Sequence, residues 1–82
     1  VINWPKTITK SCYVHNIKIV DEGIYVLVDC DDKCIKTYRG YVPNCLEIDD
    51  NCWGDYFEFT IKKNCKIKDW DFTQKDIDEL FA

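Results

Sequence analysis

The chain has 82 residues, six of them cysteines, and a formal net charge of −4 at neutral pH. A chain this short forms one domain and buries too little surface for a large core, so disulfides must supply part of its stability. The composition argues against nucleic acid as a partner, because phosphate binding needs a basic stripe. No apolar run is long enough for a membrane span or a signal-peptide core, so we expect a mature secreted protein, residues 1–82, that does not insert into membranes.

The first third of the chain predicts a β-hairpin. An extended lead-in over residues 1–11 is followed by two β-rich runs, 12–20 and 24–28. The short connection between the runs ends in Gly23, which we expect to supply the positive φ of the turn. Alternation within the first run places four residues on one face: Tyr13, His15, Ile17 and Ile19.

The middle of the chain predicts further short strands. Residues 30–34 form a tight polar turn, residues 35–42 a third strand, and residues 45–55 a loop. Residues 56–63 alternate apolar and polar side chains, which is typical of a strand with one buried face. The apolar side chains of this strand are Phe57, Phe59 and Ile61.

The C-terminal segment differs from the rest in charge and periodicity. Residues 69–82 contain five acidic residues and one basic residue, whereas residues 1–68 contain ten of each. Thr73 followed by Asp76 approximates a capping box, so we expect a short helix from residue 73. The apolar residues at helical spacing are Ile77, Leu80 and Phe81. They fit either a helix docked on the sheet, which we favour, or an acidic arm that meets a basic partner.

Taken together, these patterns predict a small disulfide-rich, mainly β domain: a hairpin, further short antiparallel strands, and a short C-terminal helix. Its disulfide framework comprises Cys12, Cys30, Cys34, Cys45, Cys52 and Cys65, whose pairing the spacing leaves open. Zinc is not favoured, because Cys30 and Cys34 lack the Cys-x2-Cys spacing of a zinc knuckle and His15 is the single histidine. The acidic clusters around Asp31 and Asp49 do not match a calcium loop.

The sequence predicts a binding protein rather than an enzyme. It has no nucleophile elbow and no phosphate-binding glycine loop, and His15 is expected to be a packed or half-exposed strand residue. We therefore expect no catalytic residue, no cofactor and no metal ion. Because Trp, Tyr and Arg dominate interface hot spots, the candidate binding residues are Tyr38, Arg39, Tyr41, Trp53 and Tyr56.

The order Cys12-Tyr13, Ile19, Gly23, Cys30 and Cys34 resembles the opening of von Willebrand factor type C-like modules. In particular it is similar to the short single-module forms among secreted arthropod proteins, including the 8.9 kDa family of tick saliva. The likeness extends over residues 35–65 by cysteine order alone, and the chain lacks the Cys-x-Cys step of those modules. The resemblance implies a salivary immune-evasion protein that inhibits a host target such as complement, a protease cascade or a cytokine.

Two other functions stay open. One is a toxin or effector that binds a channel or receptor. The other is an anticoagulant, because residues 71–81 are similar to the acidic-aromatic tails of leech and tick thrombin inhibitors. For all three functions we expect a secreted monomer whose partner is an extracellular protein.

Overall fold

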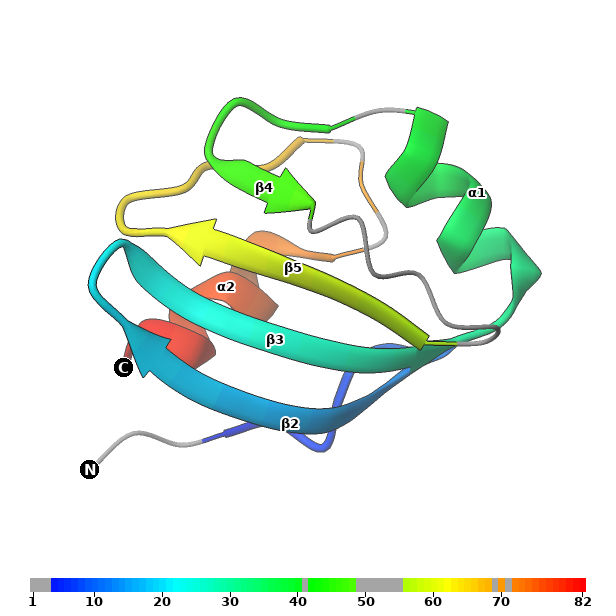
Figure 1. The fold of residues 1–82 in the computed structure, drawn as a ribbon, viewed down its shortest axis with the longest axis horizontal. Coiled ribbons are helices and arrows are strands. Elements are labelled where there is room, and N and C mark those ends of the chain that lie inside the picture. The colour runs from blue at the N-terminus through cyan, green and yellow to red at the C-terminus, as the bar shows by residue number, and fades with distance from the viewer. Residues whose placement is uncertain (1–3, 41, 49–55, 69, 71) are drawn as a thin grey trace.

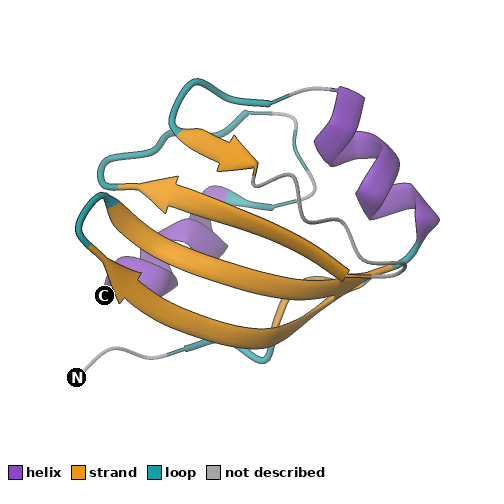
Figure 2. Ribbon diagram, in the orientation of Figure 1, coloured by secondary structure: helices purple, strands orange, loops and turns teal. Residues whose placement is uncertain are grey.

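The β-rich segments of the chain pair into one antiparallel sheet of five strands, with two short helices packed against it (Figures 1 and 2). The computed structural model describes residues 4–40, 42–48, 56–68, 70 and 72–82, without the side chains of five of them: Cys30, Lys33, Cys34, Thr37 and Arg39. The strand order is β1-β2-β3-β5-β4. The elements in chain order are β1 (Thr7–Thr9), β2 (Cys12–Val20), β3 (Gly23–Cys30), α1 (Asp32–Gly40), β4 (Leu46–Ile48), β5 (Tyr56–Lys62) and α2 (Gln74–Phe81). The expected mainly β fold with a C-terminal helix is confirmed.

The hairpin of β2 and β3 is present, and Gly23 has the positive φ predicted for it, 158°. It is the first residue of β3. Gly23 also pairs with Lys62 of β5, and a Cβ at this position would overlap the backbone carbonyl of Ile61. The glycine is required chiefly because a neighbouring strand passes too close for a side chain.

Strand β2 contains a β-bulge at His15, where the register with β3 shifts. The bulge adds one residue, so the alternation of the strand reverses at this point. Tyr13, before the bulge, points away from the core, whereas Ile17 and Ile19 stand opposite the inward-facing residues of β3. The prediction that Tyr13, Ile17 and Ile19 share one face is therefore wrong.

The predicted third strand over residues 35–42 is also wrong, because the chain forms the helix α1 there. The helix includes most of the expected polar turn, since it begins at Asp32. In its first turn the amide of Ile35 donates to the carbonyl of Asp31 (3.2 Å). Ile35 and Tyr38 are three residues apart, a spacing that places both on one helical face against the core. Their β-forming side chains thus pack equally well from a helix.

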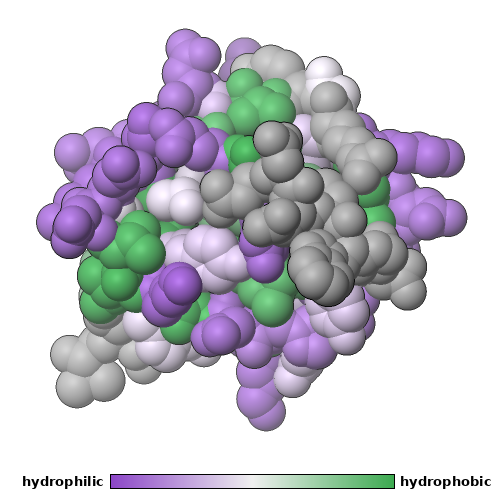
Figure 3. Space-filling model, viewed as in Figure 1, coloured by the Kyte–Doolittle hydropathy of each residue, from purple (hydrophilic) through white to green (hydrophobic). Residues whose placement is uncertain are grey.

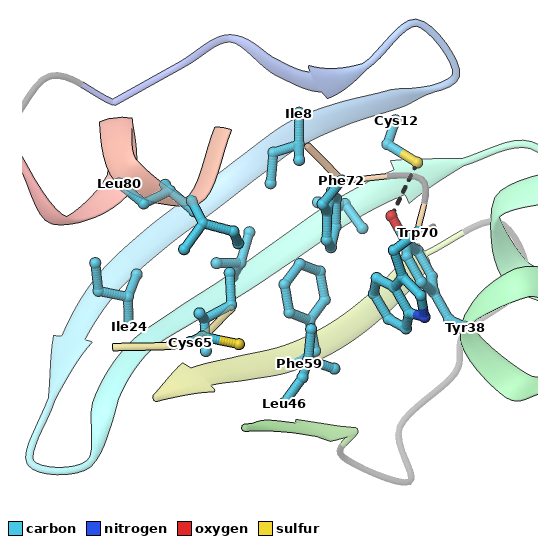
Figure 4. Close-up of a cluster of buried hydrophobic side chains, with 14 of the residues drawn as sticks. Ile8, Cys12, Ile24, Tyr38, Leu46, Phe59, Cys65, Trp70, Phe72 and Leu80 are labelled. Atoms are coloured by element: carbon cyan, nitrogen blue, oxygen red, sulfur yellow. Dashed lines mark hydrogen bonds between the residues drawn. The ribbon is translucent and has the colours of Figure 1, made fainter. Parts of the chain in front are cut away.

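The core lies between one face of the sheet and α2 (Figure 4). Strand β5 supplies the three residues predicted for it, which are fully buried: Phe57, Phe59 and Ile61. Strand β4 lies inside the segment expected to be a loop. It pairs with β5, where Leu46 is opposite Ile61. A group of rings fills one end of the core: Tyr38, Phe57, Phe59, Trp70 and Phe72.

Disulfides tie the edges of this core, as expected. Cys45, just before β4, is bonded to Cys65, just after β5. Cys12 is also disulfide-bonded, to a cysteine whose side chain lies outside the described set. The first bond fastens the short edge strand β4 to the segment that leads into α2.

Helix α2 is docked on the sheet and begins as predicted. Thr73 is its N-cap, and both halves of the capping box with Asp76 are formed. Ile77 and Leu80 lie in the hydrophobic core, so the apolar stripe of the helix is used within the domain.

Candidate binding surface

The five residues proposed for binding do not form one surface. Tyr38 lies on α1 with none of its surface exposed, and its ring stacks on Phe57 at a centroid distance of 4.4 Å. We therefore remove Tyr38 from the surface candidates. Tyr41 and Trp53 lie outside the described residues, and Arg39 is placed on α1 by its backbone alone. Tyr56, at the start of β5, is 40% exposed and remains a candidate.

Tyr56 belongs to a row of three side chains across the sheet. Asp29 of β3 pairs with Tyr13 of β2 on one side and with Tyr56 of β5 on the other. Residues directly opposite one another in a sheet project from the same face. Val28 and Phe57, the neighbours of Asp29 and Tyr56 along their strands, are buried. The row Tyr13–Asp29–Tyr56 therefore projects from the sheet face opposite α2.

This outer face is the one that Figure 3 presents, with hydrophilic, intermediate and hydrophobic residues mixed across it. In Figure 1, α2 lies behind the sheet and the described part of the chain places no helix in front of it. Leu27 and Tyr25 of β3 are half-buried here, so apolar surface on this face is in contact with solvent. The outer face is thus the broad surface that the described chain offers to a partner.

His15 contacts both tyrosines of the row. Its ring meets Tyr13 edge-on (centroids 5.5 Å apart) and lies 4.8 Å from the ring of Tyr56. The Nε2 atom of His15 is 3.5 Å from a carboxylate oxygen of Asp29. Tyr13 and His15 are two residues apart in β2, so strand alternation places both side chains on this face, as predicted for this pair. Three aromatic rings therefore lie around one carboxylate.

A hollow of about 650 Å³ adjoins the row. Its walls are the β1–β2 turn, the last residues of β3 and the first turn of α1; the lining residues are Thr7, Lys10, Ser11, Tyr13, Asp29, Asp31 and Asp32. Its volume lies within the range of known ligand sites, although it is open to solvent. Tyr13 and Asp29 belong to both the row and the hollow, so the two form one continuous surface.

Backbone and side-chain hydrogen bonds fix the shape of the hollow. The amide of Asp31 donates to the carbonyl of Ser11 (3.4 Å), which joins the start of α1 to the β1–β2 turn. The amide of Ser11 in turn donates to the hydroxyl of Thr9 (3.3 Å), and the amide of Val14 donates to the carbonyl of Lys6. These bonds hold both walls against β2. We call the row and the hollow together the Tyr13 surface, defined by Tyr13, His15, Asp29, Asp31, Asp32 and Tyr56.

The described charged side chains that line the hollow are mainly acidic. They include three carboxylates and one ammonium, that of Lys10. In the described part of the chain, no group of three or more His, Cys, Asp and Glu side chains is arranged to hold a metal ion. None of the helices within the described ranges has the length and apolar character that crossing a lipid bilayer demands.

Sequence reasoning missed Tyr13, His15 and Asp29 as functional residues. It assigned Tyr13 to the same face as Ile17, and that assignment concealed an exposed tyrosine next to a histidine. The usable signal was the Tyr13-Val14-His15 spacing in a strand whose second half has a different apolar phase. A change of apolar phase within one strand is consistent with an extra residue in that strand.

A scan against protein-family models, a search of curated proteins and a search of solved structures each found no match to this chain. The resemblance to von Willebrand factor type C-like modules therefore stays a prediction, and functional inference depends on the surface itself.

Proposed function

We propose that this protein is a secreted binding protein that inhibits an extracellular protein target through the Tyr13 surface. The observation that carries the proposal is the contact of Tyr13, His15 and Tyr56 on a sheet face that no helix of the described chain covers. Tyrosines combine large contact area with few rotatable bonds, which is why they are frequent at interface hot spots. Rings that are already held in place lose little conformational freedom when a partner binds.

The scaffold supports this function. Disulfides at Cys12 and Cys45 and a sheet that packs on α2 keep the outer face rigid. Secretion fits the cysteine content, because disulfides persist in oxidising compartments. By the resemblance of residues 12–34, the target class is complement, a protease cascade or a cytokine. We propose separately that the protein acts as a monomer.

The alternatives draw on other parts of the molecule. An anticoagulant tail would use α2, but Ile77 and Leu80 of α2 are committed to the core. Only the acidic, outward side of that helix would be left for a basic exosite. A toxin that binds a channel or receptor could use the Tyr13 surface itself, so it differs from our proposal in target rather than in site.

The experiment that tests the proposal is affinity capture from blood plasma with oxidised protein, followed by binding kinetics with each captured protein. The Tyr13→Ser/Tyr56→Ser double variant should lose the partner, since both changes are on exposed positions that leave the core intact. Ile19→Ser is the matched control, because Ile19 is 65% exposed and lies at the far end of β2. Equal capture by the double variant and the wild type would show that binding uses another surface.

A further inference from the structure

We infer that the outer edge of β2 over residues 16–20, the β2 edge, binds an extended segment of a second protein, which adds a strand to the sheet. Strand β1 covers only the first part of β2, because its pairing reaches no further than Tyr13. Next to that pairing, the amide of Val14 donates to the carbonyl of Lys6 (2.9 Å). Beyond Val14, no strand in the described part of the chain pairs with this side of β2, which runs along the lower margin of the sheet in Figure 1. The β2 edge lies outside the Tyr13 surface, so the inference goes beyond the proposed function.

A hydrogen bond at the far side of the sheet shows which way the backbone groups of each strand point. The amide of Lys62 in β5 donates to the carbonyl of Cys45 (2.9 Å), on the β4 side of the strand. Backbone groups of successive residues in a strand point to opposite sides. Those of the preceding residue, Ile61, therefore point to β3, where Ile61 is paired with Ile24. The backbone of Ile24 thus bonds to β5 and not to β2.

The same alternation leaves the backbone groups of Ile17 and Ile19 pointing outward. Tyr25 follows Ile24, so its backbone points to β2, where Tyr25 is paired with Lys18. The residues on either side of Lys18 must then direct their N–H and C=O groups away from β3. Within the described chain, no hydrogen bond to these groups of Ile17 and Ile19 crosses the outer side of β2. An extended backbone is the ligand that satisfies such a row of donors and acceptors.

The side chains on the inner face of the β2 edge require an apolar partner. Ile17 and Ile19 are paired with Val26 and Ile24, which are buried, so all four project toward the core side of the sheet. Ile17 packs partly against the core, whereas Ile19 is 65% exposed. A hollow of about 240 Å³ adjoins Ile19, and Phe81 of α2 also lines it. Apolar side chains on an added strand would cover Ile19 and remove it from water.

The side chain on the outer face of the β2 edge requires an acidic partner. Lys18 is exposed, and its ammonium lies 4.6 Å from the centroid of the Tyr25 ring. An acidic residue directly opposite Lys18 would form a favourable cross-strand pair. A second copy of this chain fits less well, because the register that uses Ile17 and Ile19 of both copies places Lys18 opposite Lys18. The occupant is therefore an apolar–acidic–apolar segment of another protein, antiparallel like every strand pair of this sheet.

The test uses the peptide acetyl-Thr-Val-Glu-Val-Thr-amide and the complete, oxidised protein. In the antiparallel arrangement, the glutamate is opposite Lys18 and the two valines are opposite Ile17 and Ile19. At a peptide concentration ten times the Kd, hydrogen exchange of the Ile17 and Ile19 amides should slow about tenfold, measured by NMR. The control peptide is methylated on both valine nitrogens, so it keeps the side chains and the charge but loses two donors. It should not slow the exchange.

Variants assign the binding to named side chains. Lys18→Glu should weaken binding of the glutamate peptide about two- to tenfold and should instead favour acetyl-Thr-Val-Lys-Val-Thr-amide. Lys10→Glu is the matched charge change, on an exposed lysine before the other end of β2, and should leave the preference between the peptides unchanged. Ile19→Ser should weaken both peptides about threefold or more, because it removes the exposed apolar contact.

Two outcomes would overturn the inference. Equal binding of the methylated peptide would show that no strand is added. Slow exchange at Ile17 and Ile19 that depends on protein concentration without peptide would show that a second copy occupies the β2 edge. Failure of the proposed function is a separate result, because Ile19→Ser should weaken the peptide and leave plasma capture through the Tyr13 surface intact.

Discussion

The phenol oxygen of Tyr38 lies 3.1 Å from the sulfur of Cys12, deep in the core, so a helix and a strand far apart in the sequence meet through polar atoms (Figure 4). Since the sulfur of Cys12 is in a disulfide and has no hydrogen, the phenol of Tyr38 is the donor. The contact gives a buried hydroxyl a partner that it needs, because an unsatisfied buried donor is costly.

This contact leads to the first prediction. Tyr38→Phe removes the hydroxyl but keeps the ring, so the free energy of unfolding should fall by about 0.5–1.5 kcal/mol. Tyr38→Ala also empties a core position and should cost about 3–5 kcal/mol. Urea denaturation measures both changes. Tyr56→Phe, on an exposed ring, is the control and should stay within about 0.5 kcal/mol of wild type. If Tyr38→Phe and Tyr56→Phe lowered the free energy of unfolding equally, that result would contradict the burial of the Tyr38 hydroxyl.

The second prediction concerns the two glycines that can be compared directly. A Cβ at Gly23 would overlap the backbone of Ile61, so Gly23→Ala should lower stability by about 1–3 kcal/mol. A Cβ at Gly40 would meet no atom within 4 Å, so Gly40→Ala at the end of α1 should be neutral or stabilise by up to about 1 kcal/mol. Thermal unfolding of both variants measures these two changes in stability. A tolerated alanine at Gly23 would mean that β3 and β5 are further apart than described.

These cases show where sequence patterns were sufficient. Strand β5 has strict alternation without interruption, so its buried residues Phe57, Phe59 and Ile61 follow directly from the period of a strand. The capping box of α2 is local, because Thr73 and Asp76 satisfy each other's backbone amides within one turn. Features that depend on neighbouring residues alone were predictable.

Features that depend on tertiary contacts were not. The segment of α1 contains Ile35 and Tyr38, which favour strands by propensity, yet their shared helical face packs on the rings of the core. The bulge at His15 reverses the faces of β2, and alternation by itself cannot show that an extra residue is present. Because the bulge separates Tyr13 and His15 from the face of Ile17 and Ile19, the candidate site was missed while the fold class was predicted.

The third prediction concerns the redox state of the cysteines. Native protein treated with an alkylating reagent should show no adduct by mass spectrometry, since we expect all six cysteines to be paired. Cys45 and Cys65 are 20 residues apart, and a loop of that size contributes about 3 kcal/mol by the chain-entropy model. Cys45→Ala/Cys65→Ala should therefore lower stability by about that amount. Two or more labelled thiols in the native protein would refute the full pairing.

The fourth prediction follows from a surface ion pair. Lys62 lies 2.7 Å from Glu47, and the hydrogen bond to that carboxylate, together with its charge, raises the pKa of Lys62. A raised pKa means that the folded state favours the ammonium form. The resulting stabilisation is thus complete below pH about 10 and is lost as the pH rises through the folded-state pKa. Glu47→Gln should return the pKa of Lys62 to its ordinary value in an NMR titration, whereas Asp76→Asn should not change it.

The fifth prediction separates the two uses considered for the C-terminal segment. Leu80 is fully buried and Thr73 caps the helix, so Leu80→Ala should cost about 2–5 kcal/mol and Thr73→Ala about 1 kcal/mol. Lys75→Ala, at an exposed position of the same helix, is the matched control and should have little effect. Deletion of residues 73–82 should expose the apolar face of the sheet and lower the thermal midpoint.

The acidic-arm hypothesis predicts a different result for the same deletion. If α2 were an arm, the shortened protein would keep its thermal midpoint, lose partner affinity, and associate more slowly in a way that depends on salt. Docking of Ile77 and Leu80 in the core predicts that the deletion lowers the thermal midpoint. Partner binding through Tyr13 and Tyr56 should then decline only as far as the folded population declines. Measuring the thermal midpoint and the association rate on one set of variants therefore distinguishes a helix that supports the sheet from a helix that contacts the partner.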